Sequence, residues 1–165
     1  MGSGKSTIGK ELAIVLNYNF LDLDDYIVSK EKVSISNLFK DRGEIYFRKK
    51  ETNYLGELIN SSENLVLALG GGTPCYGNNI DLVKDSKNVI SFYLKLSIPS
   101  LAKRLINEKE KRPLIRHLNS EEQLLEFIGK HLLERVQYYS QAQYIINTDA
   151  QTKVDTIEDI LLHLI

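Results

Sequence analysis

Met1-Gly2-Ser3-Gly4-Lys5-Ser6-Thr7 opens the chain, and this stretch decides which fold can be expected. It matches the second half of a phosphate-binding loop, G-x-x-x-x-G-K-[ST], in which small residues let backbone N–H groups surround the phosphates of a nucleotide. We expect Lys5 to reach the β- and γ-phosphates and the Ser6 hydroxyl to bind Mg²⁺. The following apolar residues have helical spacing, so the loop should lead into a helix whose N-terminus adds a partial positive charge; they are Ile8, Leu12, Val15 and Leu16.

The loop pattern has two further consequences. Its first glycine, and the strand that normally leads into it, would fall before Met1, so we expect either that the native start lies upstream or that the chain is truncated. The same residues also fit M-G-x-x-x-[ST], the signal for N-myristoylation of Gly2. The phosphate-loop interpretation is favoured because it accounts for Gly4, Lys5, Ser6 and the helix together, whereas the lipid signal uses only Gly2 and Ser6.

Composition indicates a single cytoplasmic domain. The chain has 165 residues, which is enough for one core, and a net charge of −1, which argues against a nucleic-acid partner or a basic membrane patch. One cysteine, Cys75, cannot form an internal disulfide and fits a reducing compartment. No apolar run reaches membrane-spanning length. We expect a monomer that binds neither nucleic acid nor membrane.

Strand-like runs alternate with helical patterns, which predicts an α/β fold with a parallel sheet covered on both faces. The expected strands are 20–22, 65–69, 89–94 and 144–147. The expected helices are 25–32, a short one after Ser34, 44–60 beyond a break at Gly43, one starting near Pro99, one from a Ser120–Gln123 capping box through Val136, and 156–164. Residues 107–120 are charged and contain a proline, which predicts a mobile loop.

Unusual residues gather where the predicted strands end, which is where open parallel sheets bind ligands. Asp22 and Asp24 end one strand, and Gly70, Gly71 and Gly72 end another. Phosphoryl transfer needs one carboxylate beside Mg²⁺ and another beside the acceptor hydroxyl, although paired acids alone are commonly a helix cap. Three consecutive glycines cost conformational entropy on folding, so close approach of the backbone to a ligand explains them better than a plain turn.

Basic residues are less informative when taken singly. Arg48 and Arg135 lie in helical patterns and would ordinarily be surface charges. Arg112 lies inside the 107–120 loop, where it is either a solvated charge or an arginine that closes on phosphate. Three histidines are far apart without metal-ligand spacing and are interpreted as structural or surface residues: His117, His131 and His163.

In combination, the motifs resemble the shikimate kinases, small relatives of the nucleoside monophosphate kinases. The resemblance runs in order through M-G-S-G-K-S-T, F-L-D-L-D, I-Y-F-R-K-K-E, L-A-L-G-G-G, K-R-P-L and E-R-V-Q-Y-Y. It implies a three-layer α/β/α P-loop kinase fold whose parallel sheet has five strands in the family and four visible here. It also implies a single domain over 1–165, with a substrate-binding segment at 23–60 and a mobile lid at 107–120.

The resemblance also implies a role for each matched position. Catalysis would fall to Lys5, Asp24 and Arg112, and Mg²⁺ would be held by Ser6 and, through water, by Asp22. The nucleotide would contact the loop and two arginines: Gly2, Ser3, Gly4, Lys5, Ser6, Thr7, Arg104 and Arg112. The acceptor would contact a carboxylate, two arginines and three glycines: Asp24, Arg48, Arg135, Gly70, Gly71 and Gly72.

The expected reaction is transfer of the ATP γ-phosphoryl group to the 3-hydroxyl of shikimate, a step in chorismate and aromatic amino acid biosynthesis. Two alternatives stay open. One is another small-molecule kinase of this fold, such as a gluconate kinase, because gluconate also carries a carboxylate for the arginines. The other is an inactive homologue that binds a ligand without turnover.

Overall fold

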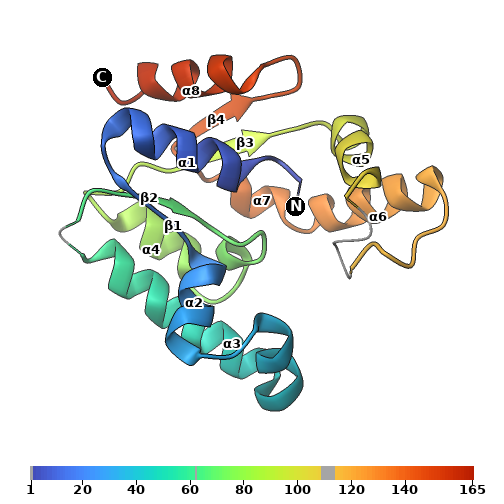
Figure 1. Ribbon diagram of the computed structural model, residues 1–165, viewed down its shortest axis with the longest axis horizontal. Helices are drawn as coiled ribbons and strands as arrows, with labels where there is room; N and C mark the ends of the chain where they lie inside the picture. Colours follow the sequence, from blue (N-terminus) through green and yellow to red (C-terminus); the bar gives the residue numbers. More distant parts are fainter. Residues whose placement is uncertain (1, 62, 109–113) are drawn as a thin grey trace. The chain divides into compact units, whose positions relative to one another are not determined.

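The computed structural model describes residues 2–61, 63–108 and 114–165, and its chain forms two compact units that we treat separately. The first along the chain is Lys5–Ser91, and the second combines residues 2–4 with Phe92–Ile165. Each unit contains a pair of parallel strands (Figure 1). Within the described ranges there is no helix with the length and apolar character needed to cross a membrane.

The Lys5–Ser91 unit is built on the parallel pair β1 (Asn19–Asp22) and β2 (Leu65–Ala68), with Asn19 opposite Leu65 and Asp22 opposite Ala68. Helix α1 (Lys5–Leu16) packs against both strands. The approach is close at Gly9, where a Cβ atom would lie 2.7 Å from the ring of Phe20, so a side chain there would push the helix off the sheet. This packing holds the start of α1 at the end of the strand pair.

Helices α2 (Leu23–Glu31) and α3 (Ile35–Ile59) fill the segment between the two strands. Asp22 caps α2 by accepting from the Asp24 N–H, and Ser34 caps α3 by accepting from the Asn37 N–H. Gly43 has φ 81° and ψ 168°, which interrupts α3 at the break expected from the sequence. The core of this unit consists of Leu23, Ile27, Leu38, Phe47, Leu55 and Val83.

A short 3₁₀ turn, η1 (Thr73–Cys75), and helix α4 (Asn79–Asp85) follow β2. Neither was expected from the sequence. The turn begins immediately after the three glycines: the Thr73 N–H donates to the Gly70 carbonyl and the Cys75 N–H to the Gly72 carbonyl. The glycine segment is therefore folded tightly against the residues that come after it.

The second unit contains the parallel pair β3 (Phe92–Lys95) and β4 (Tyr144–Asn147), with Phe92 opposite Tyr144. Its helices are α5 (Ile98–Ile106), α6 (Glu121–Leu133), α7 (Val136–Tyr139) and α8 (Lys153–Leu162). Helices α5 and α6 pack together over a core that includes Ile115, which is fully buried. The other members of this core are Leu96, Leu101, Ala102, Leu105, Leu124 and Ile128.

Three expected boundaries in this unit were wrong. Strand β3 begins at Phe92 and not at residue 89, because the Val89 N–H closes a turn onto the Ser86 carbonyl. The long helix expected to run through Val136 ends at Leu133, and Arg135, at φ −111°, separates it from α7. Helix α8 begins at Lys153 because Thr152 and Asp155 form a capping box earlier than the apolar pattern indicated.

Only half of the capping box expected at the start of α6 is present. The Ser120 hydroxyl accepts from the Gln123 N–H at 3.2 Å, as predicted. The Gln123 side chain, however, accepts from the N–H of Asn119 at 2.9 Å, one residue before the cap. The helix still begins where the sequence placed it.

Candidate active site

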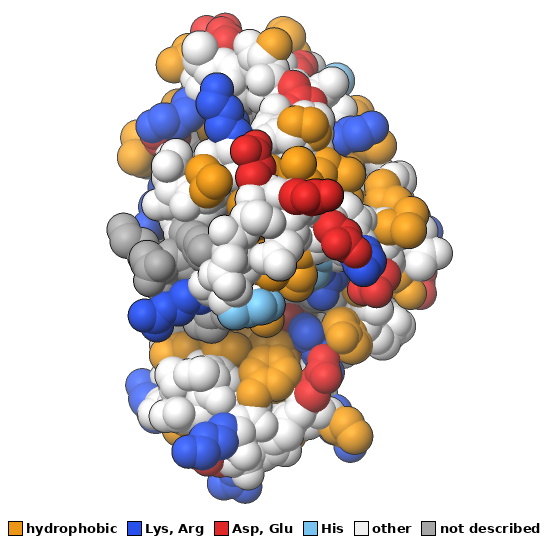
Figure 2. Space-filling model, turned by 90° about the vertical axis from the view of Figure 1, so that its right-hand side faces the viewer, with side chains coloured by type: hydrophobic (Ala, Val, Ile, Leu, Met, Phe, Trp, Pro, Cys, Tyr) orange, Lys and Arg blue, Asp and Glu red, His pale blue; other side chains and the backbone are white. Residues whose placement is uncertain are grey.

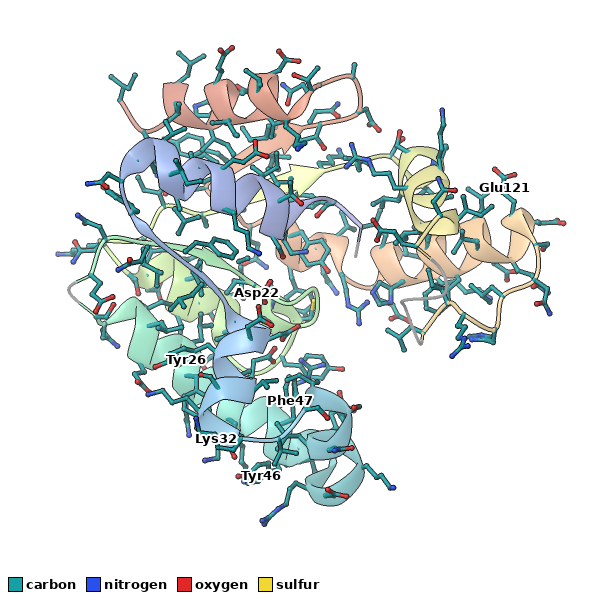
Figure 3. All side chains as sticks on the ribbon, viewed as in Figure 1. Asp22, Tyr26, Lys32, Tyr46, Phe47 and Glu121 are labelled. Atoms are coloured by element: carbon teal, nitrogen blue, oxygen red, sulfur yellow. The ribbon has the colours of Figure 1, made fainter. Side chains whose placement is uncertain are left out.

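The phosphate-loop serine and the first strand-end aspartate lie in direct contact. The Ser6 hydroxyl donates a 2.8 Å hydrogen bond to Asp22 Oδ2, and Asp22 Oδ1 accepts from the Asp24 N–H at 3.1 Å. Asp22 lies where β1 passes into α2 (Figure 3). One carboxylate thus joins the first turn of α1 to the start of α2, and two oxygen ligands predicted for a metal are brought together.

The loop ahead of α1 has a backbone that requires glycine. Gly2 has φ 75° and Gly4 has φ 86°, a conformation in which a residue with a Cβ is strained. A Cβ atom on Gly2 would also lie 3.0 Å from the side chain of Leu105. At Gly4 the nearest neighbour would be Arg104 Nη1 at 3.8 Å, so the predicted nucleotide arginine of α5 lies beside the predicted phosphate loop.

Asp24, the predicted acceptor-site carboxylate, lies in an environment that favours its protonated form. Burial raises the pKa of Asp24, the negative charges of Asp22 and Glu51 raise it further, and the positive charge of Lys5 partly offsets these effects. The Lys5 ammonium is therefore close enough to interact with Asp24. A carboxylate with a raised pKa is a stronger base than a solvated one.

Two of the three glycines, Gly70 and Gly72, lie against the two charged groups predicted for the acceptor. A Cβ atom on Gly70 would be 3.1 Å from Asp24 Oδ1 and 3.1 Å from the Thr73 hydroxyl. A Cβ atom on Gly72 would be 2.9 Å from Arg48 Nη2. The approach seen at Gly70 and Gly72 is that of protein side chains to the glycine backbone, and the predicted approach of a ligand to these glycines stays a prediction.

Arg48 is held by several contacts at once. Its Nη1 donates to Glu51 Oε2 at 2.8 Å, its Nε donates to Glu44 Oε1 at 3.4 Å, and its guanidinium carbon lies 3.8 Å from the ring centre of Tyr76. Burial opposes the charge, but the hydrogen bond and negative charge of Glu51 outweigh it, so the pKa of Arg48 is raised. Arg48 is a fixed cation and not the surface charge that its helical position alone suggested.

Sequence reasoning did not single out three residues that support this arrangement. Glu51 is 1% exposed, and its two oxygens accept from Arg48 and from the Thr73 hydroxyl, the latter at 2.7 Å. Thr73 is fully buried, and Tyr76 covers the guanidinium. The F-R-x-x-E spacing carried a signal for Glu51, which lies one helical turn after Arg48. Nothing in the sequence distinguished Thr73 or Tyr76.

In the second unit, Arg135 lies between α6 and α7, and its Nη1 is buried with no hydrogen-bond partner among the described residues. Such a group is costly to bury unless an acceptor is supplied. One helical turn earlier, burial lowers the pKa of His131 to about 4, and the positive charge of Arg135 adds to the effect. Arg112 and most of the charged centre of the predicted lid lie outside the described residues.

The histidines are placed as structural or surface residues, in agreement with the prediction. His163 stacks on Tyr144 with ring centres 4.4 Å apart, and His131 stacks on Phe127 at 5.6 Å. Across residues 2–61, 63–108 and 114–165 there is no group of three His, Cys, Asp or Glu side chains able to hold a metal by themselves. This does not conflict with Mg²⁺, which is typically bound through one or two protein oxygens together with substrate phosphates.

A glycine-rich loop that starts a helix, followed by a serine in contact with a strand-end carboxylate, is typical of phosphate-loop nucleotide-binding proteins. Comparison with known families gives the narrower assignment. The family model for shikimate kinase matches residues 1–165. The chain belongs to the shikimate kinase family.

Individual shikimate kinases are similar to this protein over nearly the whole of its chain. The shikimate kinase of Flavobacterium johnsoniae is 47% identical over 161 residues, which cover 98% of this chain and 92% of the relative. The crystal structure of shikimate kinase from Bacteroides thetaiotaomicron has a TM-score of 0.89 at 34% identity and covers 99% of this chain and 93% of that one. Shikimate kinase from Acinetobacter baumannii in complex with shikimate has a TM-score of 0.83 at 33% identity, with 99% and 88% covered. The predicted P-loop kinase fold and family are confirmed.

Proposed function

We propose that this chain transfers the γ-phosphoryl group of ATP to the 3-hydroxyl of shikimate. The observation that carries the proposal is the convergence of Asp24 and Arg48 on the glycines that follow β2. A hydroxy acid such as shikimate needs one partner for the hydroxyl that reacts and another for the carboxylate that fixes its orientation. A partly buried carboxylate beside Gly70 and a fixed guanidinium beside Gly72 supply this pair.

Asp24 binds the acceptor hydroxyl and takes its proton as the oxygen attacks phosphorus. Its raised pKa supports this role, because burial and the charges of Asp22 and Glu51 make proton uptake easier. Lys5 interacts with the same carboxylate and neutralises the charge that the transferring phosphoryl group carries. Most of the rate enhancement comes from positioning and charge stabilisation, as is usual for phosphoryl transfer.

Ser6 and Asp22 fit a site for Mg²⁺. Their side chains offer only oxygen donors, already 2.8 Å apart, and a hard cation prefers such ligands. When bound, the ion supplies positive charge to the β- and γ-phosphates. Asp22 also caps α2, so its orientation does not depend on the ion.

Arg48 and Arg135 bind the carboxylate of the acceptor, and the N–H groups of Gly70, Gly71 and Gly72 face its ring. The buried Nη1 of Arg135, which has no partner among the described residues, supports this assignment because a carboxylate oxygen would satisfy it. Charge-assisted contacts of this kind contribute about 1.5–3 kcal/mol each.

The nucleotide occupies the loop formed by Gly2, Ser3, Gly4, Lys5, Ser6 and Thr7, with Arg104 against the adenine and Arg112 on the phosphates. The position of Arg104 beside Gly4 supports its location on the nucleotide side of the site. Residues 107–120 act as a lid on a single domain spanning 1–165, and 23–60 form the acceptor-binding segment. Lid closure excludes water and suppresses hydrolysis of ATP.

We also propose a cytoplasmic monomer whose partners are its two small-molecule substrates. On the face shown in Figure 2, acidic and basic side chains are interspersed and do not form one extended basic area, which is not the surface expected for nucleic-acid binding. Size-exclusion chromatography with light scattering checks the monomer.

The test is release of ADP from ATP and Mg²⁺ by the 165-residue chain, with shikimate, gluconate or no acceptor. We expect strong release only with shikimate, a product phosphorylated at the 3-hydroxyl by ³¹P NMR, and no turnover by Lys5→Ala. Release of ADP that depends on gluconate would show that gluconate, and not shikimate, is the acceptor. Binding of ATP by calorimetry without turnover on any acceptor would instead indicate an inactive ligand-binding homologue.

A further inference from the structure

We propose that Tyr76 is a positioning residue that holds the guanidinium group of Arg48 in the orientation needed to bind the acceptor. The inference rests on the proposed function, because it assigns a purpose to a residue that touches Arg48 and not the reacting atoms. The Arg48 guanidinium carbon lies 3.8 Å from the centre of the Tyr76 ring, the shortest of the cation–ring contacts found in the described residues. At that separation the guanidinium plane and the ring are in van der Waals contact.

The guanidinium is held at its edge by carboxylates and at its face by the ring. Its Nη1 and Nε donate to Glu51 and Glu44, whereas Nη2 donates no hydrogen bond to any residue the structure describes. Nη2 is the nitrogen closest to Gly72, where a Cβ atom would lie 2.9 Å away. The edge of the guanidinium that carries Nη2 is therefore the one available to an acceptor oxygen, and it faces Gly72.

Hydrogen bonds at the edge leave the guanidinium free to tilt, and Tyr76 removes that freedom. An aromatic ring in contact with one face restricts rotation about the terminal bonds of the side chain. It also excludes water from that face, which strengthens the interaction between the cation and an incoming carboxylate. Only 19% of the Arg48 side chain is exposed, which shows how far these contacts enclose it.

The backbone of Tyr76 is held by the same group of residues. Its carbonyl accepts from the Asn79 N–H at 3.3 Å, and the Asn79 side chain, which is fully buried, donates to the Thr73 carbonyl at 2.8 Å. The Thr73 hydroxyl donates to Glu51, which in turn accepts from Arg48. Through η1, these hydrogen bonds connect the backbone that carries the Tyr76 ring to Glu51, the carboxylate that binds Arg48.

The test compares Tyr76→Phe, which keeps the ring, with Tyr76→Ala, which removes it, using steady-state kinetics. We expect Tyr76→Ala to raise the KM for shikimate by about 2- to 30-fold, the range for loss of a cation–π contact, with little change in the KM for ATP. Tyr76→Phe should have a KM for shikimate close to that of the wild type. Tyr18→Ala is a matched control, since Tyr18 is 40% exposed against 36% for Tyr76 and makes no ring contact in the described residues.

A second measurement does not depend on turnover. ¹⁵N NMR of the arginine side chains reports how fast the guanidinium of Arg48 rotates about its Nε–Cζ bond. We expect rotation to be slow in the wild type and in Tyr76→Phe and faster in Tyr76→Ala. This separates the two proposals: a wild type without shikimate-dependent ADP release contradicts the proposed function, whereas unchanged rotation in Tyr76→Ala contradicts the role of Tyr76.

Two kinetic results would also overturn the inference. If Tyr76→Phe raised the KM for shikimate as much as Tyr76→Ala does, the hydroxyl and not the ring would be the functional group. If Tyr76→Ala lowered kcat or raised the KM for ATP in the same proportion, the residue would support the unit as a whole and not the orientation of Arg48.

Discussion

The Tyr54 hydroxyl donates a 2.6 Å hydrogen bond to Glu31, and this contact joins the C-terminal half of α3 to the end of α2. Tyr46 donates to the same carboxylate at 2.8 Å, and Lys50 Nζ lies 3.0 Å from it. The three donors are spaced four residues apart, so they lie on one face of α3. Tyr46 is labelled on that helix in Figure 3. Glu31 thereby links the helix that carries Asp24 to the helix that carries Arg48.

Glu31→Gln should destabilise the protein at neutral pH and not in acid. The hydrogen bonds from Tyr54, Tyr46 and Lys50 lower the pKa of Glu31 from 4.5 to about 2. Because the folded pKa is the lower one, the charged contact stabilises the fold above about pH 4.5 and is lost as the pH falls towards 2. We expect the melting temperature to drop by about 2–4 °C near neutrality. Urea titrations over a pH series would show the deficit narrowing in acid.

A suitable control for that experiment is Glu126→Gln. Glu126 pairs with Lys130 on the surface of α6, where both side chains are more than half exposed. Exposed pairs contribute little to stability, so this variant should unfold like the wild type. A deficit of the same size in both variants, or one in Glu31→Gln that persists at low pH, would contradict the role of Glu31.

Gly72→Ala should weaken acceptor binding without unfolding the protein. Gly72 has φ −87° and ψ −23°, which alanine adopts without strain, but the added Cβ would lie 2.9 Å from Arg48 Nη2. The added Cβ displaces the Nη2 end of the guanidinium from the orientation that Glu51 and Tyr76 hold, so we expect a higher KM for shikimate and a small decrease in the melting temperature.

Gly56→Ala is the control on α3, because among the described residues no atom beyond the neighbouring residues and backbone of its own helix lies within 4 Å of the added Cβ. That variant should be stabilised by about 0.5–1 kcal/mol with unchanged kinetics. Equal KM values for shikimate in the two glycine variants would show that Arg48 does not depend on Gly72.

Asp24 should give the pH–rate profile an acid limb with a midpoint above 3.8, the ordinary aspartate value, because burial and the charges of Asp22 and Glu51 raise its pKa. Only the ionised carboxylate can accept the proton of the substrate, so kcat/KM for shikimate falls as Asp24 is protonated. Asp24→Asn should lower kcat by about 10²–10⁴-fold and remove this limb. A ¹³C NMR titration of Asp24 with a midpoint at or below 3.8 would contradict the assignment.

Arg135→Ala should raise the KM for shikimate by about tenfold to a hundredfold, the range for loss of a charge-assisted contact. Its KM for ATP should change little. Arg104→Ala, on the nucleotide side, should show the reverse pattern. A KM for shikimate within about twofold of the wild type in Arg135→Ala would be too small a change for a carboxylate ligand.

The sequence predicted those parts of the fold that local chemistry determines. The helix after Lys5, the break at Gly43 and the four strands were recognised because phosphate-loop residues, glycine and apolar runs leave strong local signals. Boundaries were missed where a hydrogen bond overrides the pattern. Val89 looks like a strand residue but closes a turn, and Thr152 starts α8 earlier than its apolar residues do.

For the site, the predicted residues of the Lys5–Ser91 unit lie close together as expected, but the groups that hold them were not foreseen. Ser6 and Asp22 are in contact, and Asp24 and Arg48 both reach the glycines. The buried Thr73 and the ring of Tyr76 contribute through tertiary contacts that no spacing in the sequence encodes. The roles assigned to all of the site residues, those of the Lys5–Ser91 unit as well as Arg104, Arg112 and Arg135, stay predictions.

The two carboxylate oxygens of Asp22 accept hydrogen bonds from two different residues: Oδ2 from the Ser6 hydroxyl and Oδ1 from the Asp24 N–H. A change at Ser6 therefore reaches Asp24 through a single carboxylate, and a change at Asp24 reaches Ser6 by the same path. Substitutions at these two positions will not act independently, so the loss of activity in a double variant will differ from the product of the separate losses. Asp22 therefore couples the predicted phosphate-binding part of the site to its predicted acceptor-binding part.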